Sequence, residues 1–231
     1  MREIVFDTET TGLDPRTGDR MVEIGCIEMI NLVPTGSSFH AYFNPERDMP
    51  SGAEAVHGLS AAFLSDKPLF RDVAGELLDF LGDAPLVAHN ASFDFGFLNA
   101  ELTICEREVV CMTRMIDTVA MAKKRHPGAK LSLDALCSRY GIDRSHRVKH
   151  GALLDAELLA QVYVELKGGR QIGLELAAEI AASSAPLAGE PVAVRQAPSG
   201  PRRDPRPHSA SAEELARHAK FISGINDPLW G

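Results

Sequence analysis

The sequence is poor in cysteine, and its cysteines show no pattern that would serve a metal site or a disulfide framework. Cys26, Cys105, Cys111 and Cys137 include no CxxC pair, so a structural zinc site is not expected. The first residues, MREIVFD, also lack the basic start and long apolar stretch of a signal peptide. Scattered cysteines in such a chain are typical of reduced thiols, and we therefore expect a cytoplasmic protein.

Long apolar runs and an excess of positive charge are also missing. No stretch of about 18 apolar residues occurs, so we expect no membrane span. The formal net charge of −8 disfavours a protein that holds long duplex DNA by bulk electrostatics, because such proteins are usually basic. A nuclease is still compatible with this charge, since the cations of a metal site would neutralise several carboxylates locally.

A change in composition at Gly168 and Gly169 divides the chain. Residues 1–170 carry apolar periodicity almost without a break, which predicts one folded domain. Residues 181–210 are dominated by Pro, Ser, Ala and Gly, a composition typical of a flexible linker. Helical periodicity returns at 212–222, where Ser211 would cap a short C-terminal helix.

The apolar pattern of residues 1–170 predicts an α/β fold. Strands are expected at 2–8, 20–30, 37–44 and 86–89, and helices at 70–82, 91–105, 117–125, 132–140 and 151–167. Short loops join the first three strands, which indicates an antiparallel start. The alternation of helices and strands that follows indicates a mixed sheet with helices on its faces.

Two carboxylates lie at the end of the first predicted strand, in REIVFDTETTG. Asp7 and Glu9 are two positions apart, so on a strand their side chains point to the same side. Like charges this close repel each other and resist burial. The pair is either a solvated strand end or part of a site that binds cations.

Two further stretches place an acid beside a buried element. In VAHNASFDFGFL, Asn90 would cap a helix whose first turn holds Asp94, and in HGALLDAELLAQVYVELK, Asp155 lies in the first turns of an amphipathic helix. His150 precedes Asp155 by five residues, so the two converge only if His150 lies in the loop before that helix. Taken alone, Asp94 is explained by the helix dipole, and His150 is explained as a solvated loop residue.

Together these stretches supply four carboxylates and one histidine. Hard cations such as Mg²⁺ or Mn²⁺ take oxygen ligands and keep positions for water and phosphate. Two such ions can stabilise the attacking and leaving oxygens of a phosphoryl transfer, and a histidine can accept the proton of the attacking water. The set therefore indicates metal-dependent phosphoryl chemistry, in which bound cations would relieve the repulsion between Asp7 and Glu9.

The motifs DTETTG, HNASFD and HGALLD, in this order, resemble those of the DEDDh class of 3′–5′ exonucleases. The resemblance covers about residues 2–170 and includes VHGLS at 56–60 and LSLDALCSRYGID at 131–143. It implies an RNase H-like fold with a mixed five-stranded sheet. It also implies release of nucleoside monophosphates from the 3′ end of DNA, preferably from a single-stranded or frayed end.

The resemblance further implies roles for individual residues. Asp7 would bridge two Mg²⁺ or Mn²⁺ ions, with Glu9 and Asp155 as ligands of the first ion. Asp94 would act through water, and His150 would be the general base. The pocket for the terminal nucleotide would be formed by Thr8, Thr10, Leu13, Val56, His57 and Phe93. His57 is equally well explained as a loop histidine bonded to the backbone, and Phe93 as a core residue.

The tail has two features of its own. Residues 171–180 contain a QxxLxL pattern that resembles a sliding-clamp-binding motif, a peptide with one polar anchor and two apolar plugs: Gln171, Leu174 and Leu176. Residues 211–231 resemble the polymerase-binding segment of replicative proofreading exonucleases, with these expected anchors: Leu215, Phe221, Ile222, Leu229 and Trp230. The implied partners are a polymerase subunit and a beta sliding clamp, and a small third subunit is left open.

Two alternatives remain at this stage. Ribonuclease T and oligoribonuclease belong to the same class, act on RNA as dimers and need no long tail, so this alternative predicts faster turnover of RNA than of DNA. In the second alternative, the chain is mainly a tether between clamp and polymerase, with a vestigial nuclease domain. The complete set of five site residues argues against the tether.

Overall fold

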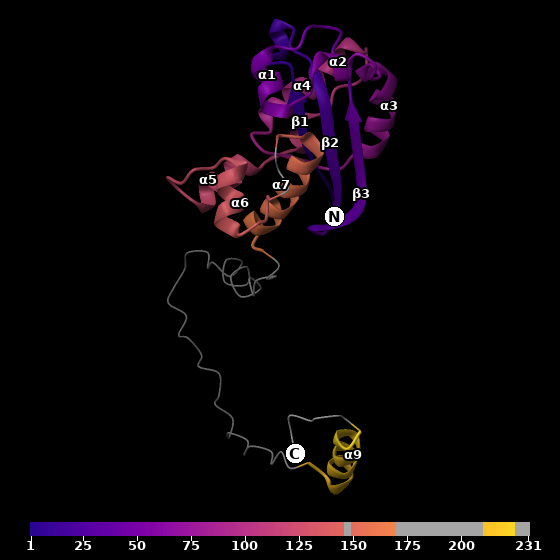
Figure 1. Ribbon diagram of the computed structural model, residues 1–231, viewed down its shortest axis with the longest axis vertical. Helices are drawn as coiled ribbons and strands as arrows, with labels where there is room; N and C mark the ends of the chain where they lie inside the picture. Colours follow the sequence, from indigo (N-terminus) through magenta and orange to yellow (C-terminus); the bar gives the residue numbers. More distant parts are fainter. Residues whose placement is uncertain (146–148, 170–209, 225–231) are drawn as a thin grey trace, which may run out of the picture. The chain divides into compact units, whose positions relative to one another are not determined.

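The computed structural model describes residues 1–145, 149–169 and 210–224. The chain forms two compact units, Met1–Ile180 and Ala181–Gly231 (Figure 1). In the described part of the chain, no helix is both long and apolar enough to cross a membrane. All four cysteines are free thiols.

A five-stranded sheet of order β3-β2-β1-β4-β5 forms the centre of the first unit. The strands are β1 (Arg2–Thr10), β2 (Met21–Ile30), β3 (Val33–Tyr42), β4 (Leu86–Ala88) and β5 (Met115–Asp117). β1, β2 and β3 pair antiparallel, whereas β4 pairs in parallel with both β1 and β5. The predicted mixed sheet with an antiparallel start is confirmed.

Helices cover both faces of this sheet (Figure 1). They are α1 (Ser51–His57), α2 (Ala61–Leu64), α3 (Phe70–Leu81), α4 (Ser92–Ile104), α5 (Thr118–Arg125), α6 (Leu133–Tyr140) and α7 (Ala152–Leu166), with single 3₁₀ turns η1 (Pro15–Thr17) and η2 (Met112–Arg114). The second unit contains α9 (Ala212–Ile222), where Ser211 and Glu214 form a capping box. The predicted cap of this helix is therefore confirmed.

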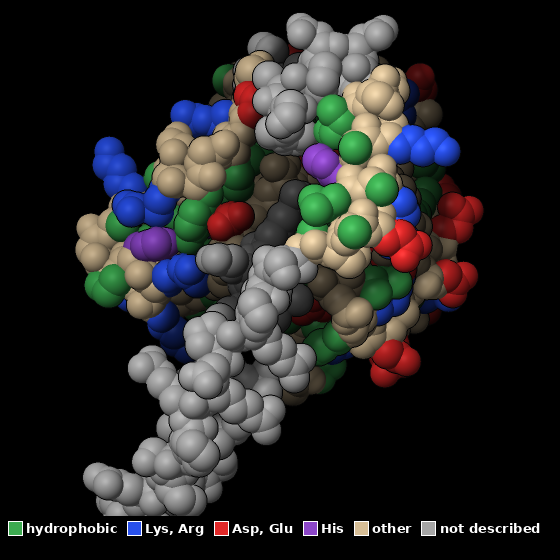
Figure 2. Space-filling view, turned by 90° about the horizontal axis from the view of Figure 1, so that it is seen from below, with side chains coloured by type: hydrophobic (Ala, Val, Ile, Leu, Met, Phe, Trp, Pro, Cys, Tyr) green, Lys and Arg blue, Asp and Glu red, His purple; other side chains and the backbone are tan. Residues whose placement is uncertain are grey.

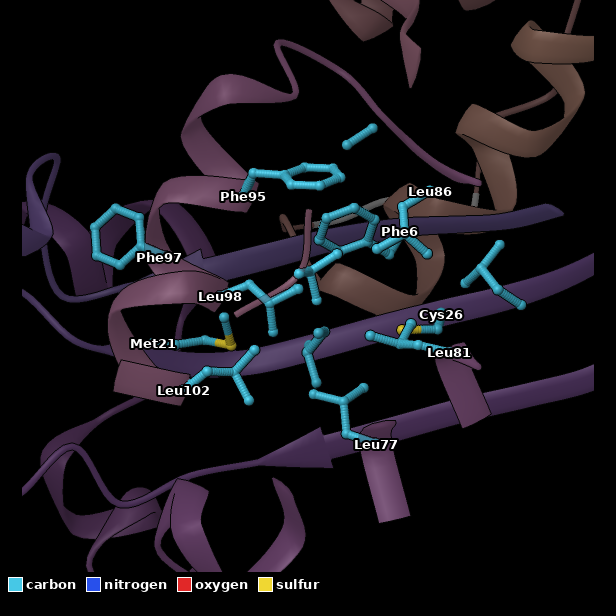
Figure 3. Packing of buried hydrophobic residues seen from close by; sticks show 14 of the residues in the cluster. Phe6, Met21, Cys26, Leu77, Leu81, Leu86, Phe95, Phe97, Leu98 and Leu102 are labelled. Atoms are coloured by element: carbon cyan, nitrogen blue, oxygen red, sulfur yellow. The ribbon is translucent and has the colours of Figure 1, made fainter. Parts of the chain in front are cut away.

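The apolar core has two parts, one on each face of the sheet. On the first face, Figure 3 shows Phe95 of α4 against Phe6 of β1. The centroids of these two rings are 5.7 Å apart in an edge-to-face arrangement, which is the geometry that aromatic pairs prefer. On the second face, Val5 packs in one cluster with residues of α6 and α7. Alternate residues of β1 thus face α4 and α7.

Helix α7 approaches the sheet closely because β2 has a glycine beneath it. Gly25 pairs with Asp7 of β1, and a Cβ added at Gly25 would overlap the backbone N and Cα of Leu153 in α7. Farther along α7, the Tyr163 hydroxyl donates a hydrogen bond to Glu3 Oε1 at 2.7 Å. The start of α7 is therefore held against the strand pair that carries Asp7.

Several elements differ from the sequence-based prediction. The positions of β5 and of the helices α1 and α2 were not predicted, although the resemblance implied a fifth strand, and β3 starts at Val33, before the predicted residue 37. β5 has only three half-buried residues, too few for a period. The first half of β3 is exposed and contains Pro34 and Gly36, which are unfavourable within strands and occur mainly at sheet edges.

Replacing Gly25 with Ala tests the contact between β2 and α7. The added methyl group has to displace the α7 backbone, so we expect the free energy of unfolding to fall by about 1–3 kcal/mol. Gly75→Ala is the matched control: it lies inside α3 with no atom within 4 Å of an added Cβ, and it should raise stability by up to about 1 kcal/mol. Urea unfolding of both variants measures this, and equal stability of the two would contradict the close packing.

Candidate active site

A cleft of about 280 Å³ opens at the carboxyl ends of the parallel neighbours β1 and β4. Residues from β1, from the start of α4 and α6, and from the loop before α7 meet there. The cleft is lined by Asp7, Thr8, Glu9, His89, Asn90, Phe93, Asp94, Ser132, Leu133, Asp134, His150 and Asp155. All five residues of the predicted catalytic set are among them.

Asp7 and Glu9 project from β1 on the side of α7. They share this side with Glu3 and Val5, which contact α7. Glu9 is 9 % exposed, and its partner across the strand pair is another buried acid, Glu23. Glu23 is satisfied separately, since its Oε1 lies 2.7 Å from Nε2 of His40. The carboxylates of β1 are thus held in place by the sheet itself.

Asp94 enters the cleft from the first turn of α4. Thr8 lies on the opposite side of β1 from Asp7 and Glu9, and its hydroxyl donates to Asp94 Oδ1 at 2.8 Å. Asp94 is 3 % exposed. Burial raises its pKa from 3.8 to about 7, although the hydrogen bond from Thr8 acts in the opposite direction. An ionised Asp94 is therefore favoured by a nearby cation.

His150 and Asp155 come together at the start of α7. His150 lies in the loop before the helix, and its Nδ1 is 3.2 Å from Asp155 Oδ2. Asp155 is almost fully buried, whereas the His150 side chain is 46 % exposed. Glu9, His150 and Asp155 each offer one possible ligand atom, and these three atoms all lie within 4.8 Å of one another. This group has the donor types and spacing that a divalent cation requires.

The residues predicted to bind the terminal nucleotide do not all line this cleft. Thr8 and Phe93 do, and Leu13, which is 84 % exposed, lines a neighbouring hollow that also includes Phe93. Thr10 and Val56 are not among the lining residues. Thr10 donates its hydroxyl hydrogen to the carbonyl oxygen of Gly12 at 2.6 Å, and Val56 is 50 % exposed.

His57 is buried beside the turn that follows α1. Its Nδ1 accepts a hydrogen bond from the backbone N–H of Leu59 at 3.0 Å. Its Nε2 is buried without a hydrogen-bond partner among the described residues. Burial lowers the pKa of this imidazole, which favours the neutral form. His57 therefore keeps one N–H that a ligand could accept.

Five lining residues were absent from the predicted set: His89, Asn90, Ser132, Leu133 and Asp134. Asn90 does not cap α4, contrary to the prediction. It adopts a left-handed conformation with φ of 64°, and its N–H donates to Asp117 Oδ1 at 3.1 Å. The N-cap of α4 is Ala91, whose side chain forms no capping bond. The position of Asn90 directly after a buried strand was the available signal.

Known proteins share both the sequence and the fold. The family model described as an exonuclease matches residues 4–163. The chain therefore belongs to the exonuclease family. Among solved structures, the nuclease domain of 3′hExo, a DEDDh family member bound to rAMP, has a TM-score of 0.63 at 17% identity, with 72% of this chain and 91% of that chain covered. The predicted RNase H-like exonuclease fold is confirmed.

The particular branch of the family follows from closer relatives. The DNA polymerase III subunit epsilon of Rickettsia felis is 47% identical over 228 residues, which are 97% of this chain and 97% of the relative. The same subunit of Escherichia coli K12 is 45% identical over 176 residues, which are 73% of this chain and 72% of the relative. The chain belongs to the DNA polymerase III epsilon subunits. The prediction of a proofreading 3′–5′ exonuclease is thereby confirmed, and the ribonuclease alternative gains no support.

Removing the Thr8 hydroxyl tests the contact between β1 and α4. Thr8→Val keeps the shape of the side chain but removes the side-chain donor of the Asp94 carboxylate, at an expected cost of about 1–2 kcal/mol. If this cost falls on the transition state, kcat decreases about tenfold. Thr8→Ser retains the hydroxyl and should stay within about threefold of the parent. Initial rates of single-strand degradation measure this, and a wild-type rate for Thr8→Val would contradict it.

Proposed function

We propose that the chain hydrolyses the 3′-terminal phosphodiester of DNA at the cleft of Asp7, Glu9, Asp94, Asp155 and His150, and that it uses two divalent ions there. One observation carries this assignment. Four carboxylates from three separate elements converge in one small cleft, and Glu9, Asp94 and Asp155 are almost fully buried. Such a costly arrangement of like charges is typical of a site built to hold cations.

The donor set fits hard cations. Carboxylate oxygens dominate the cleft, and no cysteine lines it, which favours Mg²⁺ or Mn²⁺ over thiolate-preferring metals. Asp7, Glu9, Asp94 and Asp155 would hold the ions. When bound, such ions supply charge to stabilise the attacking and leaving oxygens of the phosphoryl transfer. The raised pKa of Asp94 agrees with a carboxylate that requires a cation to ionise.

His150 is the residue best placed to accept a proton. Its Nδ1 lies 3.2 Å from Asp155 Oδ2, and an imidazole oriented by a carboxylate is a suitable general base. Its partial exposure leaves room for a water molecule beside it. Asp155 thus has two tasks in this proposal, since it orients the imidazole and contributes to the cation site.

The substrate we propose is the 3′ end of a single-stranded or frayed DNA. Exonuclease X, solved in complex with 5′ overhanging duplex DNA, has a TM-score of 0.59 and 27% identity, with 77% of this chain and 98% of that chain covered. A mispaired end unpairs at lower cost than a paired one, which gives selectivity without reading the sequence. Phe93 and Thr8 line the cleft, and Leu13 and His57 lie nearby as candidate contacts to the terminal nucleotide.

Asp7→Ala tests the whole assignment. With Mg²⁺ or Mn²⁺, the parent should shorten single-stranded DNA from its 3′ end faster than matched RNA, and EDTA should stop it. The variant should lose about 1,000-fold or more in rate, because several kcal/mol of cation-dependent stabilisation are removed. Asp83→Ala changes an exposed acid outside the cleft and should retain activity. A metal-independent parent, or an active Asp7→Ala variant with the native fold, would contradict the proposal.

The tail would connect the nuclease to the replicase. We place the polymerase contact, to the DNA polymerase III alpha subunit, on α9 and the residues after it. Leu215 and Phe221 of α9 are 58 % and 67 % exposed, and two exposed apolar side chains on one short helix offer contacts that a partner could cover. Ile222, also an expected anchor, is half-buried at the end of α9. The other two expected anchors, Leu229 and Trp230, lie outside the described residues, and so does the clamp-binding segment of Gln171, Leu174 and Leu176. We propose a theta-like small subunit as a further partner and the cytoplasm as the location of the protein.

Leu215→Glu with Phe221→Glu tests the role of α9. Charges at both anchors should weaken binding to the purified alpha subunit at least about tenfold, since burying an unpaired carboxylate is costly. Glu213→Gln with Lys220→Gln alters two exposed polar side chains of the same helix and serves as the control. Titration calorimetry gives the affinities. Unchanged affinity of the double Glu variant would exclude these two side chains from the interface, while DNA trimming by the free subunit should be the same for all variants.

A further inference from the structure

Positive charge is concentrated in one segment of an otherwise acidic chain. Residues 118–149 contain eight of the 24 Lys and Arg residues and two of the 32 Asp and Glu residues, whereas the whole chain has a formal net charge of −8. The segment covers α5, α6 and the loop that leads to His150. Figure 2 shows Lys and Arg side chains gathered at the left of the view, the side of α5 and α6, and most of the visible acidic side chains at the right.

Seven of these cations belong to the described residues; all seven are exposed, and few of them are paired. Arg144 forms an ion pair with Asp134 at 2.8 Å. Four other exposed side chains, which we call the α5–α6 patch, form no ion pair with any described residue: Lys123, Lys124, Lys130 and Arg139. A group of unpaired like charges raises the local potential and attracts anions.

The two helices of the patch form one connected surface. His126 at the end of α5 and Tyr140 at the end of α6 are joined by a contact of 2.6 Å between Nε2 and the hydroxyl oxygen. Arg125 Nη1 donates to the carbonyl oxygen of Leu166 at 3.1 Å, which ties α5 to the end of α7. Side chains of α5, α6 and α7 also share one apolar cluster. Lys123, Lys124 and Arg139 therefore stand on helices that are fixed to each other and to α7, and Lys130 lies in the short loop between α5 and α6.

The patch reaches the rim of the cleft at two points. Ser132, Leu133 and Asp134 line the cleft at the start of α6, and Lys130 lies two residues before Ser132. On the other side, Lys149 directly precedes His150, and its side chain lies against Gly58, because a Cβ added at Gly58 would overlap it. Positive charge thus continues from the α5–α6 patch to both edges of the cleft.

We propose that the α5–α6 patch, together with Lys149, binds the phosphates of the strand whose 3′ end lies in the cleft. This inference rests on the proposed function. It assigns a binding surface to the nucleotides of the substrate that the cleft cannot hold. A cleft of about 280 Å³ is at the lower end of small-molecule pocket sizes, so the preceding nucleotides of a strand lie outside it. Lysine side chains on a firm surface beside the cleft are the groups that hold a phosphate backbone without reading its sequence.

The triple variant Lys123→Gln, Lys124→Gln and Lys130→Gln in the full chain tests this proposal. Its KM for a single strand of about 12 nucleotides should rise about tenfold, and the slope of log KM against log salt should fall by about 2, since each lost phosphate contact contributes about 0.7. Its kcat, and its turnover of a dinucleotide too short to reach the patch, should match those of the parent. The control Arg71→Gln with Arg107→Gln removes exposed cations from α3 and from the turn after α4, and it should leave KM and slope unchanged.

The same experiment distinguishes failure of this proposal from failure of the proposed function. An unchanged KM and salt slope on the long strand would overturn the proposal, and so would an equal loss on the dinucleotide, because the lysines would then act through the cleft itself. If the variant degraded DNA normally but bound the polymerase subunit less tightly, the patch would serve an acidic protein surface, and the proposal would be wrong. A parent that degrades neither substrate would contradict the proposed function instead.

Discussion

The repulsion between carboxylates in one cleft is the constraint on which the first unit depends. Asp7, Glu9, Asp94 and Asp155 are brought together where little water can screen them, and they stay there only if the framework is stiff or a cation offsets their charge. Stiffness comes from the sheet, which holds Asp7 and Glu9 in register with β2. It also comes from α7, which Gly25 allows to approach the sheet closely enough to bring Asp155 near Glu9.

The two faces of β1 contact different helices, and each face carries site residues. Odd-numbered residues near its end face α7, where His150 and Asp155 are bonded to each other. Even-numbered residues face α4, where Thr8 donates to Asp94. A strand end is the one place where side chains from both faces can meet, because neither helix intervenes beyond it. Asp94 is buried beside this strand end, and this burial raises its pKa although the Thr8 hydroxyl and the backbone of Thr8 and Asp94 donate hydrogen bonds to its carboxylate.

Acidic and basic side chains occupy different parts of the first unit. Acids gather in the cleft, where cations would be bound, and basic side chains without an ion pair to a described residue lie on α5, on α6 and in the loop between them. A net negative nuclease that nevertheless has one positive track would hold a strand weakly by itself. Such weak binding suits a subunit whose hold on DNA is strengthened by partners, and the exposed apolar residues of α9 are where we propose that one of them attaches.

The sequence by itself determined the elements with a clear period and the residues that carry the chemistry. β1, β2, α3, α4, α6 and α7 were predictable because burial imposes alternation or a helical repeat on local sequence. Asp7, Glu9, Asp94, His150 and Asp155 were predictable because they stand in three motifs beside such elements. Only the tertiary structure decided the rest. β5 is too short to show a period, Asn90 bonds to Asp117 instead of capping α4, and Ser132 and His89 reach the cleft from distant parts of the chain. These contacts arise from pairing and packing between segments far apart in sequence, which no local pattern records.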